Sequence, residues 1–189
     1  MRIFITERAM DEATCRLVRS AMDAGVPEPT EVLEEGMAVR EDARQASHIE
    51  VPQAILDLVE GCLDAQRDAI GAFFRRRIRS REGVSLLRYE PGGFYGPHVD
   101  RAVVSTWPEA AERAVTVVLF LDSSRDRAPD GAFSGGLLRL FPVSPGAVPI
   151  EIAAVQGTLV AFPSDMVHEV TPVMSGRRDT AVDWFRADG

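Results

Sequence analysis

The chain has 189 residues, 46% hydrophobic and 26% charged, with a formal net charge of −8, which predicts one globular domain with a sizeable core. The negative charge argues against a general nucleic-acid binder, and no apolar run approaches the roughly 18 residues of a membrane span. The chain starts without an apolar signal core, and Cys15 and Cys62 are interpreted as reduced thiols, so a cytoplasmic protein is expected.

The first 24 residues predict a short strand followed by a helix. Residues 2–5 alternate like a short strand, and Thr6 is a plausible N-cap for a helix over about residues 7–24. A break rich in Gly and Pro follows. Residues 30–50 are polar and weakly patterned, and His48 within them is interpreted as an ordinary surface histidine.

A second helix is expected from Pro52, which suits a first helical turn, to about residue 78. Its apolar residues recur at helical spacing and predict a core face. Residues 1–80 are therefore interpreted as a mainly helical support region. The predicted core face consists of Ile55, Leu58, Val59, Cys62, Ala69, Ile70 and Phe73.

From Val84 onward, short apolar or alternating runs are separated by Gly, Pro, Asp and Ser, which is typical of β-strands. Many short strands in succession predict a mainly β fold, a sandwich or jelly roll, with the N-terminal helices covering one sheet. No repeat or linker indicates a second domain, so residues 84–187 are expected to form the core of a single domain spanning 1–189. The predicted strands are 84–89, 114–121, 136–141, 148–152, 158–162 and 180–185.

Two of the three histidines belong to a pattern typical of a metal site. His98 and Asp100 are two residues apart, and such residues project to the same face of an extended strand. His168 is the only reasonable third ligand. Two imidazoles and a carboxylate suit non-haem Fe(II) with open coordination positions. Each histidine alone would be better explained as a hydrogen-bonded structural residue, but the combination favours a metal site.

An arginine at the start of the last strand could hold the carboxylate of a cosubstrate, because a planar guanidinium matches a carboxylate. Arg177 and Arg178 compete for this role, since strand alternation turns only one of them inward. Tyr89 could donate its phenol to the same ligand, and Thr116 is a weaker polar candidate. The residues alone leave the choice of arginine open.

Three segments carry a resemblance to a known family. Leu87–Asp100, LRYEPGGFYGPHVD, resembles the metal-site strand and loop of the prolyl 4-hydroxylase group of Fe(II)/2-oxoglutarate oxygenases. The segments SGGLLRLFP at Ser134–Pro142 and VHEVTPVMSGRRDTAVDWF at Val167–Phe185 resemble the same group. They come especially close to the prolyl hydroxylases that act on oxygen-sensing transcription factors. The resemblance covers a little over half of the chain.

The resemblance implies a double-stranded β-helix, the jelly-roll, cupin-like form of this family. It makes His98, Asp100 and His168 the catalytic iron ligands. It also selects Arg178 for the C5 carboxylate of 2-oxoglutarate, because the corresponding basic residue precedes a tryptophan by six positions, here Trp184.

Tyr89 matches a tyrosine that hydrogen-bonds the same carboxylate in that group. The chain departs from the oxygen-sensing relatives at Leu119 and Phe120, where they carry tyrosines in the cosubstrate pocket. One cosubstrate hydrogen bond is therefore expected to be missing or to be supplied by Thr116.

The implied activity is hydroxylation of an unactivated C–H bond, coupled to decarboxylation of 2-oxoglutarate to succinate and CO2. Fe(II), 2-oxoglutarate and O2 are the expected cofactor and cosubstrates, with ascorbate as a candidate auxiliary reductant. A prolyl or other residue of a protein or peptide is the first choice of substrate, and a free amino acid or small natural product the alternative. A non-redox metal-binding jelly roll and a sensor without turnover are the competing classes. The oligomeric state is left open.

Substrate entry is expected to be gated by the loop 101–114 that follows the first ligands, together with the Gly92–Gly96 turn. Trp107 is the favoured substrate-facing aromatic residue, although packing of the loop onto the core would explain it equally well. The further candidates for substrate contact are Tyr95, Arg101 and Trp184.

Overall fold

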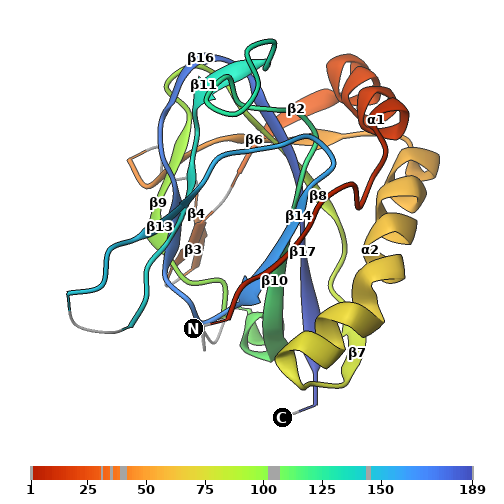
Figure 1. Cartoon of the computed structure of the whole chain (residues 1–189), viewed down its shortest axis with the longest axis vertical. Helices are drawn as coiled ribbons and strands as arrows, with labels where there is room; N and C mark the ends of the chain where they lie inside the picture. The colour runs from red at the N-terminus through yellow and green to blue at the C-terminus, as the bar shows by residue number, and fades with distance from the viewer. Residues whose placement is uncertain are drawn as a thin grey trace.

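The computed structural model describes residues 2–30, 32–34, 36–38, 42–101, 107–143 and 146–188. Strands in these residues form two facing sheets, and two helices lie along the outer side of the larger sheet (Figure 1). The predicted jelly roll with helices on one sheet is therefore confirmed. Neither described helix combines the length and the apolar composition that crossing a bilayer requires.

The larger sheet is antiparallel, with the strand order β1-β14-β10-β17-β8-β6-β2 and with β7 beside β17. Residues on its two faces alternate between the helix side and the inside of the jelly roll. Its strands are β1 (Phe4–Thr6), β2 (Val26–Pro29), β6 (Ser47–Glu50), β7 (Ile78–Arg81), β8 (Ser85–Tyr89), β10 (Arg113–Phe120), β14 (Leu159–Pro163) and β17 (Arg178–Ala187).

The smaller sheet has the order β13-β12-β15-β9-β5, and two short strand pairs and a 3-10 helix complete the described elements. Its strands are β5 (Arg44–Gln45), β9 (Phe94–His98), β12 (Leu138–Leu140), β13 (Ile150–Ile152) and β15 (His168–Val170). The short pairs are β3 (Val32–Glu34) with β4 (Gly36–Ala38), and β11 (Phe133–Gly135) with β16 (Val173–Gly176); the 3-10 helix η1 spans Pro108–Glu112.

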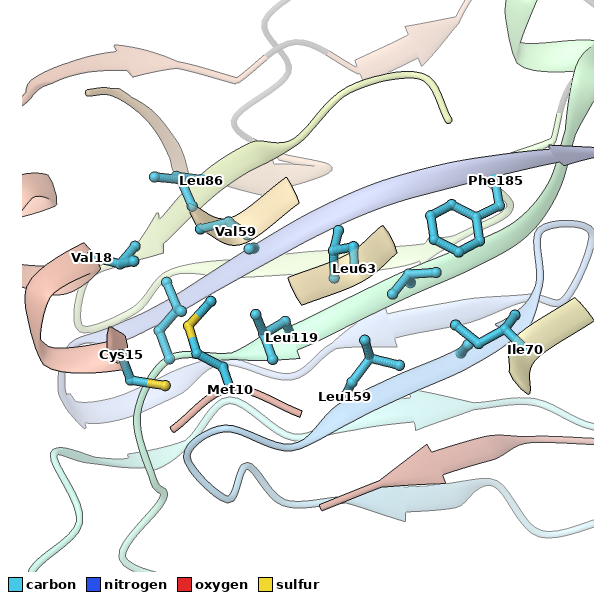
Figure 2. Packing of buried hydrophobic residues seen from close by; sticks show 14 of the residues in the cluster. Met10, Cys15, Val18, Val59, Leu63, Ile70, Leu86, Leu119, Leu159 and Phe185 are labelled. Carbon is cyan, nitrogen blue, oxygen red and sulfur yellow. The ribbon is translucent and has the colours of Figure 1, made fainter. Parts of the chain in front are cut away.

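The helices α1 (Glu12–Ala24) and α2 (Gln53–Phe74) bury apolar side chains against the outer face of the larger sheet. Figure 2 shows Val59, Leu63 and Ile70 of α2 in one cluster with Leu119 and Phe185 of the sheet. Burial of such side chains is the main stabilising contribution to this layer.

The first helix begins five residues later than predicted. Asp11 is its N-cap, and its carboxylate accepts hydrogen bonds from the Thr14 amide (2.9 Å) and hydroxyl (2.8 Å). The predicted cap Thr6 lies instead in β1, opposite Leu159. Tertiary strand pairing therefore outweighed the local capping signal.

The second helix is also shorter than predicted, and its buried face is slightly rotated. It ends at Phe74 because Arg75 adopts a left-handed conformation with φ 57°. Leu58, predicted in the core, is 44% exposed, whereas Leu63 is 1% exposed. Ala69 is exposed as well, and Phe74 packs against the core in place of Phe73. Ile55, Val59, Cys62 and Ile70 pack against the sheet as expected.

The weakly patterned segment 30–50 contributes strands to both sheets. β6 pairs with β8 at one end of the larger sheet, and β5 pairs with β9 of the smaller sheet. The sequence signal for these strands is weak because the segment is rich in charged residues and follows the prolines Pro27 and Pro29 of β2, and edge strands tolerate both kinds of residue. Part of the N-terminal region thus forms a wall of the jelly roll.

Candidate active site

The pairing of β9 with β15 brings the two predicted metal-binding histidines together. His98 ends β9 and His168 begins β15, and they are direct partners in the antiparallel register, with ring centroids 4.1 Å apart. Asp100 follows β9 by two residues. One ligand atom from each of the three side chains lies within 4.8 Å of the others. Among the described residues, this is the cluster suited to holding a metal ion.

Backbone carbonyls fix the orientation of both imidazole rings. Nδ1 of His98 lies 2.9 Å from the Gly96 carbonyl, and Nδ1 of His168 lies 2.9 Å from the Met166 carbonyl. Only a protonated Nδ1 can donate to a carbonyl, so each neutral ring presents an unprotonated Nε2. The Nε2 atoms face the Asp100 carboxylate at 3.6 Å (His98 to Oδ1) and 3.3 Å (His168 to Oδ2).

Burial and mutual charge set the protonation of this cluster. Burial by itself would raise the pKa of Asp100, but the two histidines hold that pKa well below its ordinary value. Burial and the neighbouring His168 lower the pKa of His98. Burial opposes charge on His168 too, yet the Asp100 carboxylate raises the pKa of His168. The cluster therefore offers an ionised carboxylate to a cation.

The three side chains open into a cavity of about 510 Å³ between the sheets. Predicted site residues that line it are Tyr89, Tyr95, Trp107, Thr116, Arg178 and Trp184, together with the three metal-site residues. Arg101 does not line this cavity: it is exposed, and its Nε donates to the Ala111 carbonyl at 3.0 Å. Its predicted contact with substrate has no support in this arrangement.

Arg178 extends into the cavity from the start of β17. It is 1% exposed, and no described acidic side chain forms a salt bridge with it. Its Nε has no hydrogen-bond partner, and its guanidinium lies over the rings of Tyr89 (5.1 Å) and Phe120 (5.5 Å). Burial lowers the pKa of its guanidinium. A buried cation without an anion is costly, so this position suits an anionic ligand.

Arg177, the competing arginine, points to the other side of the larger sheet. Its guanidinium pairs with Asp23 of α1, outside the cavity. Strand alternation thus places the two neighbours on opposite faces, as the sequence predicted without deciding between them.

The candidate substrate aromatics contact Arg113. Its guanidinium lies 3.8 Å from the ring centroid of Trp184 and 4.5 Å from that of Trp107. Glu82 accepts from Arg113 with both carboxylate oxygens. Tyr95 instead stacks on the ring of His98, with centroids 3.5 Å apart, and burial raises the pKa of its phenol to about 12. Tyr95 therefore packs against the imidazole of His98, and its phenol stays protonated at neutral pH.

Several cavity residues were not predicted from the sequence. His48, interpreted as a surface residue, is half-buried and lines the cavity opposite Glu28 across the β2–β6 pair. Thr30 and Arg44 line the same cavity, and the guanidinium of Arg113 lies over the rings of both tryptophans. The period of two in Ser47–Glu50 was the available signal, but four residues are too few to distinguish it from chance.

The predicted gating segments are only partly described. Residues 102–106 of the loop 101–114 lie outside the described residues, whereas Pro108–Glu112 form η1. Of the Gly92–Gly96 turn, only the first part is a turn, since Phe94–His98 form β9. Gly92 and Gly93 exchange backbone hydrogen bonds with Val173, which ties this turn to β16.

The sequence matches the family model of the 2OG-Fe(II) oxygenase superfamily over residues 84–186. Curated relatives include a PKHD-type hydroxylase of Shewanella oneidensis, 35% identical over 100 residues, which are 53% of this chain and 41% of that protein. A PKHD-type hydroxylase of Acaryochloris marina is 34% identical over 60% of this chain and 47% of that protein. The matches thus span less than half the length of these relatives.

Solved structures share the fold over nearly the whole chain. A prolyl-4-hydroxylase of Pseudomonas putida superimposes with a TM-score of 0.73 at 24% identity, covering 99% of this chain and 93% of that one. A prolyl hydroxylase of Trichoplax adhaerens, in complex with a hypoxia inducible factor peptide fragment, gives 0.75 at 18% identity, covering 97% and 83%. At these identities, the likeness supports the jelly-roll architecture.

Proposed function

This chain belongs to the 2OG-Fe(II) oxygenase superfamily, and from that premise we propose that it is an Fe(II)- and 2-oxoglutarate-dependent hydroxylase. The observation that carries the proposal is the cavity itself. It combines two imidazoles and a carboxylate, His98, His168 and Asp100, with the buried, unpaired cation of Arg178.

The residues present fit the iron that the family implies. Two Nε2 atoms and an ionised carboxylate are a donor set suited to Fe(II) that leaves positions open for other ligands. His98, Asp100 and His168 would hold the ion, and the carbonyls of Gly96 and Met166 would keep the rings oriented. The interpretation as a non-redox metal-binding jelly roll gives no reason for the cation of Arg178 in the same cavity.

When bound, iron with 2-oxoglutarate and O2 supplies the oxidation, in which one oxygen atom enters the substrate C–H bond and the other enters succinate as CO2 leaves. Arg178 would bind the far carboxylate of 2-oxoglutarate, which would compensate the charge of this buried guanidinium. Tyr89, whose ring lies beside that guanidinium, would assist with its phenol. The apolar cavity residues Leu87, Val118, Leu138 and Val182 would exclude water around the reaction.

The proposed substrate is a residue of a protein or peptide, with proline as the first choice. The support comes from relatives named PKHD-type hydroxylases and from the structural neighbour bound to a peptide fragment. A free amino acid or small natural product is the alternative outcome of the same experiment.

The test combines turnover and ligand binding. The purified chain should convert 2-oxoglutarate to succinate only with Fe(II) and O2, and His168→Ala should abolish both succinate release and stoichiometric Fe(II) binding. Mass spectrometry of proline-containing peptides and of free amino acids, each added to the active protein, should reveal a gain of one oxygen atom. Full activity in His168→Ala would refute the site assignment.

A further inference from the structure

The Asp100 carboxylate is held by a buried pair of hydroxyl groups that the mechanism above does not use. Thr116 of β10 donates its hydroxyl proton to Asp100 Oδ2 at 2.7 Å. Thr116 Oγ1 also lies 3.0 Å from the hydroxyl oxygen of Ser164, which follows the end of β14. Both residues are buried, so no bulk water competes for these bonds.

The direction of the two hydrogen bonds follows from counting protons. An ionised carboxylate can only accept, and the hydroxyl of Thr116 has one proton to give. Thr116 therefore donates its proton to Asp100. In the contact between the two hydroxyl groups, Ser164 must be the donor and Thr116 the acceptor. The chain of donors runs from Ser164 to Thr116 to Asp100. A hydrogen bond to a charged acceptor is stronger than a neutral one.

The backbone reinforces the same arrangement. The Ser164 carbonyl accepts from the amides of Asp100 (3.0 Å) and Arg101 (2.8 Å), and the Ser164 amide donates to the Ala114 carbonyl (3.2 Å). Arg113 donates from Nη1 to the Asp100 carbonyl at 3.2 Å. Both ends of Asp100, side chain and main chain, are therefore fixed by β10 and by the residue after β14.

An irregularity in β10 allows two of its side chains to reach Asp100. The register between β10 and β17 shifts between Arg113 and Val115, so Arg113 lies opposite Arg186 and Thr116 opposite Trp184. Residues 184 and 186 share one face of β17, and the shift therefore places Arg113 and Thr116 on one face as well. Without this register shift, Arg113 and Thr116 would face opposite sides of the sheet, because they are three residues apart in one strand.

We propose that Thr116, with Ser164 behind it, is a positioning residue that fixes the rotation of the Asp100 carboxylate and favours metal binding through a single oxygen. A carboxylate can bind a metal with one or both oxygens, and the bond from Thr116 occupies a lone pair of Oδ2. Single-oxygen binding leaves open the coordination positions that the proposed function requires. This inference rests on the proposed function only for the identity of the metal.

The experiment measures metal binding rather than turnover. Co(II) is titrated anaerobically into the metal-free full chain, and affinity is read by calorimetry and ligand geometry by the visible absorption of the bound ion. Thr116→Val removes the donor at nearly constant volume and should weaken Co(II) binding roughly 10- to 100-fold, the usual effect of losing a partner of a metal ligand. It should also change the absorption spectrum.

Two further variants make the result specific to the hydroxyl. Thr116→Ser keeps the donor and should restore affinity and spectrum to near the wild type. Ser164→Ala removes the second donor and should shift both in the direction of Thr116→Val, by less. Thr158→Val is the matched control, because the Thr158 hydroxyl, at the other end of β14, is buried without a hydrogen-bond partner. That control should leave Co(II) binding unchanged.

The outcomes separate this inference from the proposed function. Wild-type affinity and spectrum in Thr116→Val, or equal weakening in Thr116→Ser and Thr116→Val, would overturn the positioning role. If Thr116→Val does not fold, Ser164→Ala decides alone, and an unchanged spectrum there overturns the role. Altered Co(II) binding in a protein that never forms succinate would uphold the positioning role and contradict the proposed function instead.

Discussion

At the scale of single residues, Arg178 is the feature with the clearest chemical consequence. Its guanidinium is buried beside Tyr89 and Phe120 and has no carboxylate partner among the described residues, whereas Arg177 pairs with Asp23. The departure from the oxygen-sensing relatives at Phe120 is visible here, since a phenyl ring can stack on the cation but cannot donate a hydrogen bond.

Replacing Arg178 by Gln should raise the KM for 2-oxoglutarate more than tenfold. Each charged hydrogen bond contributes ~1.5–3 kcal/mol, and about 1.4 kcal/mol is a factor of ten. The measurement is the initial rate of succinate formation against 2-oxoglutarate concentration. Arg177→Gln is the matched control and should leave this KM nearly unchanged. The opposite ranking of the two variants would show that the wrong arginine has been assigned.

Sequence reasoning succeeded for residues whose chemistry is rare in the chain. With three histidines in total, His98 and His168 had few competing explanations, and their spacing to Asp100 fitted a strand. It failed for His48, because no local pattern distinguishes a cavity wall from solvent when the partners Glu28 and Leu87 belong to other strands.

At the scale of elements, the segment before β12 shows how one glycine shapes the cavity. Gly136 has φ 59°, and a Cβ atom built there would lie 2.9 Å from Cδ of Arg178. The glycine therefore provides both the left-handed backbone and the space through which the arginine side chain passes.

Gly136→Ala should destabilise the protein by ~1–2 kcal/mol, the cost of a left-handed non-glycine residue, and should also raise the KM for 2-oxoglutarate by displacing Arg178. Thermal or chemical unfolding and steady-state kinetics measure the two effects. Gly146→Ala offers a matched control, since Gly146 has φ 76° but no atom of the described residues lies within 4 Å of a Cβ built there. It should lose stability and keep its KM. An unchanged KM in Gly136→Ala would mean that the site does not need this space.

Trp107, at the start of η1, should matter for substrate more than for cosubstrate. It lines the cavity and stacks with Arg113, whereas the ring beside Arg178 is that of Tyr89. Trp107→Ala should therefore lower substrate hydroxylation several-fold more than substrate-free 2-oxoglutarate decarboxylation. Parallel loss of both rates, measured by product mass and succinate release, would indicate a purely structural residue.

At the scale of the whole molecule, a layer of charged side chains connects α1 to the larger sheet. Asp179 accepts from Arg88 with both oxygens, Arg88 also contacts Asp23, and Arg19 lies 3.5 Å from Asp122. Asp122 is buried, with one carboxylate oxygen unpaired, and burial raises its pKa to about 7. The helix layer is therefore held by charge as well as by apolar packing.

This layer should make stability depend on pH. In the folded protein Asp122 keeps its proton up to about pH 7, whereas in the unfolded chain it loses the proton near its ordinary pKa. The folded state thus binds more protons between these values, so the free energy of unfolding falls as pH rises from about 4 to 7. Chemical unfolding of Asp122→Asn should show a weaker decline over this range than the wild type. Parallel curves for the two proteins would contradict the shifted titration.

The architecture as a whole was predictable because its strongest signals are long or repeated. The strands around β10, β14 and β17 are apolar and bounded by turn residues, and the two helices have clear periodicity. The boundaries of α1 and the strands between α1 and α2 were not predictable, since they depend on partners far away in the chain. β6, for example, is defined by its pairing with β8, about forty residues later.

The alternation at the start of β17 makes the site sensitive to the register of this strand against its neighbours. Arg178 faces the cavity, and Asp179 faces the helices, where it pairs with Arg88. Adjacent residues of opposite charge therefore lie on opposite faces of the sheet. One residue inserted after Gly176, if the rest of β17 kept its pairing, would leave the site intact. If the strand slipped by one position instead, Arg177 would take the place of Arg178 and Arg178 the place of Asp179, so a cation would replace the carboxylate partner of Arg88. Changes in the length of this turn are therefore expected only where the pairing of β17 with β8 and β10 is kept.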